Sequence, residues 1–236
     1  MSILERRERE KKKRRQDIIN AAEKLFFSKG YDNVSMNDIA EKAELSKATL
    51  YLYFENKESL FFAIVLKGTE ILNSMIRRSV KKDFKGIKKV EAFRNAYFNF
   101  TEQYPDYINI YNYFQSGRFN PPQNEILKGI SDDSSKKESK NNNMPYVNEC
   151  ALEILKLRKE RFFILCKSLE EGMVDGTIRK DIDPVETAIL LSAISKSLSN
   201  IPADHEKILQ ERNINHQQYF RDVSEFIQRM IRNNEL

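Results

Sequence analysis

Apolar residues recur at intervals of three and four along most of this chain, and strict alternation of apolar and polar residues is rare. This spacing indicates amphipathic helices. One stripe runs from Ile18 to Phe26 and stops at Gly30, where glycine marks an expected helix end. A second, shorter stripe comprises Met36, Ile39, Ala40 and Ala43. The pattern therefore predicts a helix ending near residue 29 and a short helix soon after it.

Residues 35–57 have the pattern of two short helices joined by a tight turn. Ser35 is a good N-cap, and Asp38 stands three residues later, where a capping box reserves a place for an acceptor. Residues 44–45 form the expected turn, and Ser46 caps the second helix. The segment therefore has the outline of a helix-turn-helix.

The second of these helices has an outward face suited to polar contacts. Leu50 and Phe54 are its expected inward residues. The outward set is Lys47, Ala48, Thr49, Tyr51 and Tyr53. This set combines a cation, a small residue, a hydroxyl and two phenols. Because a helix-turn-helix places its second helix in the DNA major groove, the pattern predicts that this face contacts DNA.

The remainder of the chain has the pattern of longer helices. They are expected over about 56–80, 87–103, 106–115, 146–174, 184–200 and 215–233. Residues 131–143 contain no apolar member and predict a mobile surface loop. The expected fold is all-α, with a three-helix DNA-binding domain at residues 1–58 and a larger helical domain at residues 59–236.

Aromatic residues are concentrated between residues 84 and 119, which hold eleven of the chain's 25. Helices lined in this way could enclose an apolar cavity with phenol hydroxyls as polar handles. Equally, each of these rings could simply be part of the core. The candidates for a ligand-binding role are Phe93, Tyr97, Phe100, Tyr104, Tyr107, Tyr111 and Phe114.

The net charge of +5 is located almost entirely in residues 1–15, which carry eight Lys/Arg and three Glu. The rest of the chain balances at 32 basic against 32 acidic residues. A basic run of this kind is either a solvated, frayed helix end or an arm that binds phosphates or the minor groove. Its position beside a helix-turn-helix favours the DNA-binding arm.

Several other functions find no support in the sequence. No apolar run approaches 18 residues and no export signal is visible, so neither membrane insertion nor secretion is expected. Cys150 and Cys166 fall on one helix, about 24 Å apart by its rise, which excludes a disulfide between them. The two histidines, His205 and His216, lie in an expected polar loop and at a helix start. No metal-ligand spacing, phosphate loop or catalytic arrangement can be assembled, so neither an enzyme nor a cofactor is expected.

The N-terminal motifs closely resemble the DNA-binding domain of the TetR (tetracycline-repressor-like) family over roughly residues 15–65. The matching residues are Ala21-Ala22-x-x-Leu25-Phe26-x-x-x-Gly30-Tyr31, Ser35-x-x-x-Ile39-Ala40 and Leu45-Ser46-Lys47-Ala48-Thr49-Leu50-Tyr51-x-Tyr53-Phe54-x-Asn56-Lys57-Glu58-x-Leu60. Two positions depart from the family pattern. Glu44 stands where glycine is usual in the turn, and Tyr53 stands where histidine is commonest. A non-glycine residue at positive φ would strain the turn slightly.

The resemblance implies roles for the outward residues. Lys47, Ala48 and Tyr51 would face base edges. Ser35, Thr49, Tyr53 and Lys57 would hold phosphates, and Ser46 completes the expected DNA-binding set. The implied partner is a double-stranded DNA operator of near-palindromic sequence, read by two copies of the chain.

The resemblance also implies a role for the second domain in ligand binding and dimerisation. In this family the aromatic-rich helices surround an inducer pocket, and the last two helices pair with their symmetry mates. Here these would be about 184–200, with Ser195 facing the partner, and 215–233. Intramolecular packing alone is the alternative for both. The expected protein is a cytoplasmic homodimeric repressor released by a small, largely apolar or aromatic ligand. The alternative function is a ligand-independent DNA-binding adaptor that recruits a protein partner.

Overall fold

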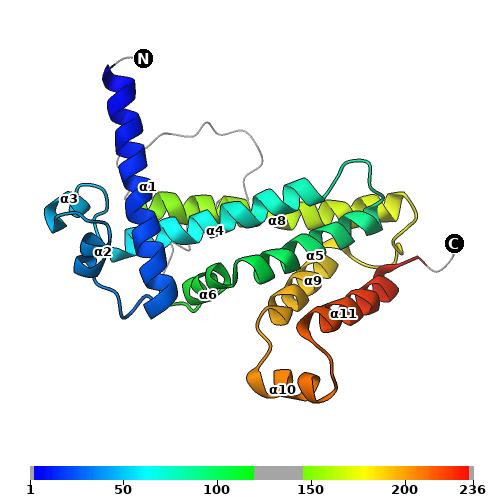
Figure 1. Ribbon diagram of the computed structural model, residues 1–236. Helices are drawn as coiled ribbons and strands as arrows, with labels where there is room; N and C mark the ends of the chain where they lie inside the picture. The colour runs from blue at the N-terminus through cyan, green and yellow to red at the C-terminus, as the bar shows by residue number, and fades with distance from the viewer. Residues whose placement is uncertain (1–2, 120–145, 234–236) are drawn as a thin grey trace. The chain divides into compact units, whose positions relative to one another are not determined.

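The computed structural model describes residues 3–119 and 146–233. Within these two ranges the chain forms α-helices and no β-strand (Figure 1). The all-α class predicted from the sequence is confirmed. The predicted loop at residues 131–143 lies outside the described residues.

The helices follow the order predicted from the apolar stripes, with one addition, α10. Their bounds are α1 Ile3–Lys29, α2 Met36–Lys42, α3 Lys47–Tyr51, α4 Lys57–Ser79, α5 Gly86–Gln103, α6 Pro105–Phe114, α8 Tyr146–Val174, α9 Pro184–Leu198, α10 Ala203–Glu211 and α11 His216–Ile231. Gly30 ends α1 with a φ of 76°, a conformation that glycine adopts without strain. Asp183 caps α9 and accepts hydrogen bonds from the backbone of Val185 and Glu186, with proline at the first helical position.

The chain forms two compact units. The first comprises Met1–Thr69 and Asp106–Lys156, and the second comprises Glu70–Pro105 and Leu157–Leu236. Helices α4 and α8 therefore each contribute residues to both units. The domain boundary expected at residues 58–59 remains a prediction.

The core of the first unit is rich in aromatic rings. Tyr31, which follows α1, lies 4.8 Å from Phe61 of α4 and 5.4 Å from Phe119, measured between ring centroids. Phe61 and Phe119 stack at 4.7 Å, and Phe62 meets Phe114 of α6 at 5.3 Å. Edge and offset contacts of this kind add to the stabilisation from apolar burial. These rings connect the end of α1 to α4 and to the end of α6.

The second unit is built around α5. Gly86 at its start lies so close to α8 that a Cβ on Gly86 would stand 2.1 Å from the backbone of Gly172. Asp175 also accepts a hydrogen bond from the Gly86 amide at 2.7 Å. Helices α9 and α11 pack against α5, where Phe98, Leu198 and Phe220 form one buried cluster. Figure 1 shows α9 and α11 side by side, with α10 beyond their ends.

Two sequence expectations need correction here. His205 lies in helix α10 and not in a loop, although α10 buries none of its residues. In addition, α4 is long and apolar enough to meet a length-and-composition test for a membrane span. However, 67% of the window that meets the test is buried inside the protein, as in the core helix of a globular unit.

Candidate nucleic-acid interface

The first helix of the helix-turn-helix is held by its N-cap. Ser35 Oγ accepts a hydrogen bond from the Asp38 amide at 3.2 Å, and Asp38 Oδ2 accepts one from the Ser35 amide at 2.7 Å. This reciprocal pair is the capping box predicted from the sequence. Hydrogen bonds from the hydroxyl and amide of Ser35 lower the pKa of Asp38 below its usual value. The carboxylate that caps α2 is thereby kept ionised.

The second helix, α3, is capped in the same way. Ser46 Oγ accepts a hydrogen bond from the Thr49 amide at 3.1 Å. The turn before it places Glu44 at a φ of 55°, so this non-glycine residue adopts the left-handed conformation that the sequence analysis identified as mildly strained. Leu50 and Phe54 are buried at 0% and 1% exposure, as predicted. Leu50 therefore fixes which face of α3 meets solvent, and Phe54 lies three residues beyond the end of that helix.

The predicted DNA-contacting residues are all exposed or half-buried. Ser35, Ser46, Lys47, Ala48 and Tyr51 are exposed, whereas Thr49, Tyr53 and Lys57 are half-buried. The Tyr51 side chain is among the chain's exposed large hydrophobic groups, at 45% exposure. Figure 1 shows α2 and α3 together on one side of α1, so α3 is not covered by α1. The base-facing and phosphate-binding roles of these residues remain predictions.

Lys57 differs from the other candidates because its ammonium already has partners. Its Nζ donates a hydrogen bond to the Tyr31 carbonyl at 2.9 Å and lies 4.2 Å from the centroid of the Tyr31 ring. Burial, followed by the nearby charge of Glu58, raises the pKa of Tyr31 to about 12. The phenol therefore stays neutral, and Lys57 links α4 to the segment that follows α1.

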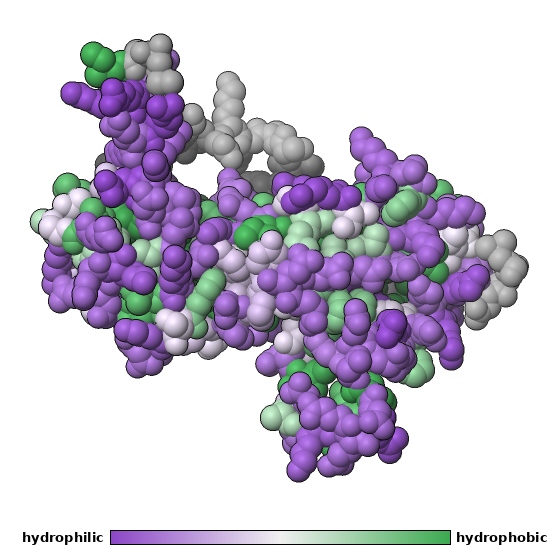
Figure 2. Space-filling model, viewed as in Figure 1, coloured by the Kyte–Doolittle hydropathy of each residue, from purple (hydrophilic) through white to green (hydrophobic). Residues whose placement is uncertain are grey.

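The basic arm is helical. Residues 3–15 continue α1 without interruption, and all of them are exposed except Arg15, which is half-buried. The guanidinium of Arg15 lies 4.5 Å from the centroid of the Phe54 ring. Figure 2 shows the surface of this arm dominated by hydrophilic residues. The arm therefore presents its cations from a helix that projects about 18 Å beyond Arg15.

A polar cluster on the segment after α1 was missed by the sequence analysis. Asp32 Oδ2 accepts hydrogen bonds from Tyr113 at 3.0 Å and from Arg118 at 2.8 Å. Burial and the bond to Asp32 raise the pKa of the Tyr113 phenol. No local sequence motif predicts these hydrogen bonds, because more than 80 residues separate Asp32 from both of its partners. It ties the end of α6 to the loop between α1 and α2.

The seven aromatic ligand-binding candidates do not fall in one unit. Phe93, Tyr97, Phe100 and Tyr104 belong to the second unit, and Tyr107, Tyr111 and Phe114 belong to the first. Four of the seven are buried: Phe93, Phe100, Tyr107 and Phe114. Among them, Phe100 contacts Tyr104 at a centroid distance of 5.4 Å, and Tyr107 contacts Phe27 edge-on at 5.1 Å. A role for these rings in binding a ligand remains a prediction.

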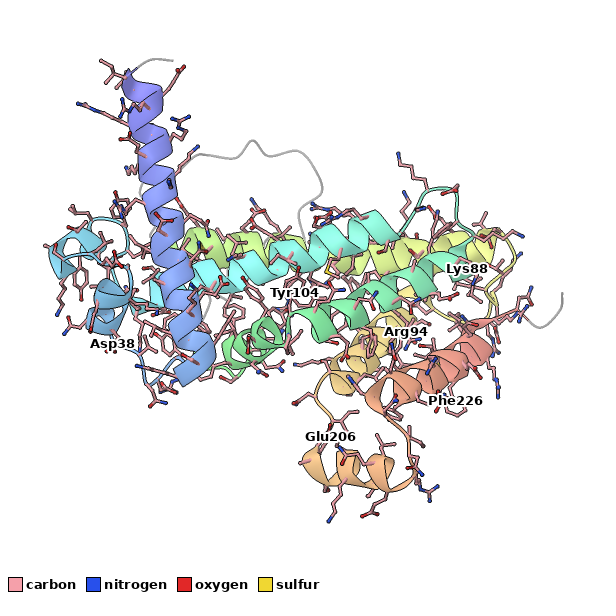
Figure 3. All side chains as sticks on the ribbon, viewed as in Figure 1. Asp38, Lys88, Arg94, Tyr104, Glu206 and Phe226 are labelled. Atoms are coloured by element: carbon pink, nitrogen blue, oxygen red, sulfur yellow. The ribbon has the colours of Figure 1, made fainter. Side chains whose placement is uncertain are left out.

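The last two long helices have exposed apolar side chains. On α9 these are Val185, Ile189 and Leu190, and on α11 they are Phe226 and Met230, with exposures between 38% and 64%. Figure 3 labels Phe226 on α11.

The expectation that Ser195 faces a partner is wrong. Its side chain is 8% exposed and donates to the Leu191 carbonyl at 2.8 Å. Phe220 and Ile227 are likewise buried within the chain. Periodicity indicates which residues share a helix face, but it does not distinguish the side that packs within the chain from the side that stays exposed.

Comparison with known proteins agrees with this geometry. Residues 18–64 match the model of the bacterial regulatory proteins of the tetR family. The chain is 30% identical over 89 residues to the HTH-type transcriptional activator FasR of Mycolicibacterium smegmatis, covering 38% of this chain and 41% of that protein. It is 33% identical over 88 residues to IcaR of Staphylococcus aureus strain Newman, the HTH-type negative transcriptional regulator of the biofilm operon icaADBC, covering 37% and 47%. The chain thus spans less than half the length of these two curated relatives.

A solved structure extends the similarity of fold to most of the chain. AibR in complex with isovaleryl coenzyme A and operator DNA aligns over 89% of this chain and 96% of that one, with a TM-score of 0.59 and 17% sequence identity. The matched helix-turn-helix and the shared helical fold together define the class: residues 18–64 form a DNA-binding domain of the TetR type within an all-α chain.

Proposed function

We propose that this chain is a cytoplasmic, homodimeric transcriptional regulator that binds a near-palindromic DNA operator through α3 and is released by a small, largely apolar or aromatic ligand. The observation that carries the proposal is the outward face of α3. There Lys47, Ala48 and Tyr51 are exposed while Leu50 is fully buried, as is Phe54 just after the helix. A rigidly held helix with a polar outer face suits insertion into a major groove.

Contacts to the DNA phosphate backbone would come from the residues around α3. Thr49, Tyr53 and Ser35 flank the exposed face, and the basic helix of residues 3–15 supplies further cations. Phosphate contacts position a protein on DNA without reading its sequence, whereas contacts to base edges specify it. We therefore assign sequence reading to Lys47, Ala48 and Tyr51.

Release by a ligand is supported by the chain's TetR-type domain and by its aromatic helices. AibR, a structural neighbour, was solved with both isovaleryl coenzyme A and operator DNA. A ligand that binds best when two DNA-binding domains are misaligned for successive major grooves shifts the population off DNA. FasR is named an activator and IcaR a negative regulator, so similar DNA-binding domains occur in both activators and repressors. We propose repression for this chain.

The experiment is selection of a binding sequence from random duplexes, followed by affinity measurements with Tyr51→Ala. Loss of a base contact should cost about 1–3 kcal/mol and relax the preference at the contacted position. Phe163→Ala is the matched control, because Phe163 is an aromatic residue of α8 with 56% exposure outside the helix-turn-helix.

Three outcomes decide between the proposals. If wild-type protein selects no sequence, the proposed function is wrong. If Tyr51→Ala binds the selected sequence as tightly as the wild type, the assigned reading surface is wrong. A protein that binds its operator identically with every ligand tested, but co-purifies with a protein partner, would support the adaptor alternative.

A further inference from the structure

Arg94, in the middle of α5, carries a buried guanidinium with unpaired donors. Its side chain is 3% exposed, and its Nε and Nη2 have no hydrogen-bond partner in the part of the chain that the structure describes. Burial lowers its pKa to about 10. A buried charge without hydrogen-bonded partners is costly, and protein interiors rarely leave one in place. The two donors of Arg94 are therefore suited to an acceptor that the described residues do not supply.

An aromatic neighbour interacts with the charge of Arg94 and leaves these donors unsatisfied. The guanidinium carbon of Arg94 lies 5.5 Å from the centroid of the Phe220 ring on α11. A ring attracts a cation through its π face, whereas the N–H donors of arginine lie in the plane of the guanidinium. Figure 3 labels Arg94 on α5, close to α9 and α11.

Two other arginines of this chain show what the unpaired edge of Arg94 is suited to hold. Arg77 uses Nε and Nη2 to bind both carboxylate oxygens of Glu160, with Nε 2.6 Å from Oε1. Arg179 binds both oxygens of Asp181 through the same pair of nitrogens, with Nε 2.5 Å from Oδ1. Such two-pronged pairing matches the planar geometry of a carboxylate. Arg94 offers the same two donors with no acceptor among the described residues.

The ring beside Arg94 belongs to an apolar cluster. Phe98, one helical turn further along α5, stacks on Phe220 with ring centroids 3.9 Å apart. The side chains that pack against this pair and Leu198 are Ile194, Tyr219 and Val223, all only partly buried. A ligand whose charged end binds Arg94 would therefore have apolar side chains nearby against which its apolar body could pack.

We propose that Arg94 binds the carboxylate of a small organic acid whose apolar body packs against Phe98 and Phe220. If this acid is the ligand that releases DNA, the inference names the chemical class of that ligand and to that extent rests on the proposed function. Binding of the acid itself does not depend on DNA. The two can therefore fail separately.

The first measurement compares thermal unfolding of the full chain, without ligand, as wild type and as Arg94→Met. Replacing an unpaired buried charge by an apolar side chain of similar length should raise the midpoint, by about 2–4 °C for a chain of this size. Arg78→Met is the control, because Arg78 is exposed on α4 and hydrogen-bonds locally to Ser74. A lower midpoint for Arg94→Met, or failure to fold, would show that Arg94 has a structural partner and overturn the proposal.

The second measurement is calorimetric titration with octanoate and phenylacetate, each beside its neutral amide, and with inorganic phosphate. The carboxylates should bind the wild type and Arg78→Met alike, and about 10- to 100-fold more weakly to Arg94→Met. Arg94→Lys keeps the charge but loses the paired donors, so it should also lose most of the affinity.

Four results would contradict the assignment of a carboxylate site. The first is equal binding of the acids and their amides. The second is undiminished binding of the acids to Arg94→Met. The third is no binding of either acid to the wild type. The fourth is binding of phosphate as tight as that of the acids, which would indicate a general anion site. Operator binding by the wild type, measured separately, tests the proposed function without bearing on these results.

Discussion

The ammonium of Lys57 donates a hydrogen bond to the carbonyl of Tyr31 at 2.9 Å and also lies over the Tyr31 ring. A residue expected to hold a DNA phosphate thus also joins the first turn of α4 to the loop after α1. Lysine has three donors, so this contact leaves donors for a phosphate. The same side chain can therefore serve both the fold and the interface.

Lys57→Ala should consequently have two measurable effects. Loss of the Tyr31 contacts should lower the free energy of unfolding by about 1–2 kcal/mol, because a half-buried carbonyl loses its donor. Loss of a phosphate contact should weaken binding to all DNA sequences alike and reduce the salt slope by about one. Denaturant unfolding and salt-dependent affinity measure the two separately. A stability loss with an unchanged salt slope would leave Lys57 a structural role only.

Removing positive charge from the helical arm, residues 3–15, should weaken DNA binding without disturbing the fold. Replacing Lys11, Lys12 and Lys13 by glutamine should preserve α1, because these side chains are exposed and glutamine is a good helix former. Affinity for DNA should fall, and the salt slope should drop by about 0.9 for each phosphate that the variant no longer neutralises.

The control for the arm carries the same change of charge elsewhere. Lys81, Lys82 and Lys85 are exposed residues between α4 and α5, and their triple glutamine variant should keep the wild-type salt slope. Equal slopes for the wild type and the arm variant would show that the arm is only a solvated helix end.

The dimer prediction rests on the exposed apolar side chains of α9 and α11. Ile189 of α9 is 57% exposed and Phe226 of α11 is 64% exposed. If α9 and α11 pair with a second copy, Ile189→Glu with Phe226→Glu should give a folded monomer, because charge is costly in an apolar interface. Light scattering measures the mass, and affinity for the full operator should fall steeply because one half-site contact cannot replace two.

Val174→Glu provides the matched control for the dimer. Val174 ends α8 with 87% exposure and lies on neither α9 nor α11. This variant should remain a dimer with unchanged DNA affinity. A soluble dimer of the double variant that still binds its operator would place the interface elsewhere.

Close packing at the start of α5 predicts a large effect from a small substitution. A methyl group at Gly86 would meet the backbone of Gly172, which cannot rotate away as a side chain can. Gly86→Ala should therefore lower the free energy of unfolding by about 1–3 kcal/mol or more, despite the better helix propensity of alanine. Lys88→Ala, at an exposed position of the same helix, should change it little. Denaturant unfolding decides, and equal stability of both variants would contradict the close approach of the two backbones.

The features that the sequence predicted correctly depend on residues close together in the chain. Ser35 and Ser46 cap their helices through amides three residues away. The end of α1 at Gly30 depends only on the positive φ that this glycine itself adopts. Leu50 is buried because a short helix in this motif has one inward face, and Phe54, which follows α3, is buried as well. Local hydrogen bonds and helical periodicity are written directly in the order of residues.

By itself, then, the sequence determined the all-α class, the helix-turn-helix and the identity of its outward residues. The tertiary structure alone decided which residues of α9 and α11 pack within the chain: it buried Ser195, and it left Phe226 exposed. It also brought Lys57 to Tyr31 and left two donors of Arg94 without an acceptor among the described residues. These outcomes depend on contacts between segments far apart in the chain, and periodicity specifies which residues share a helix face but not which surface that face will meet.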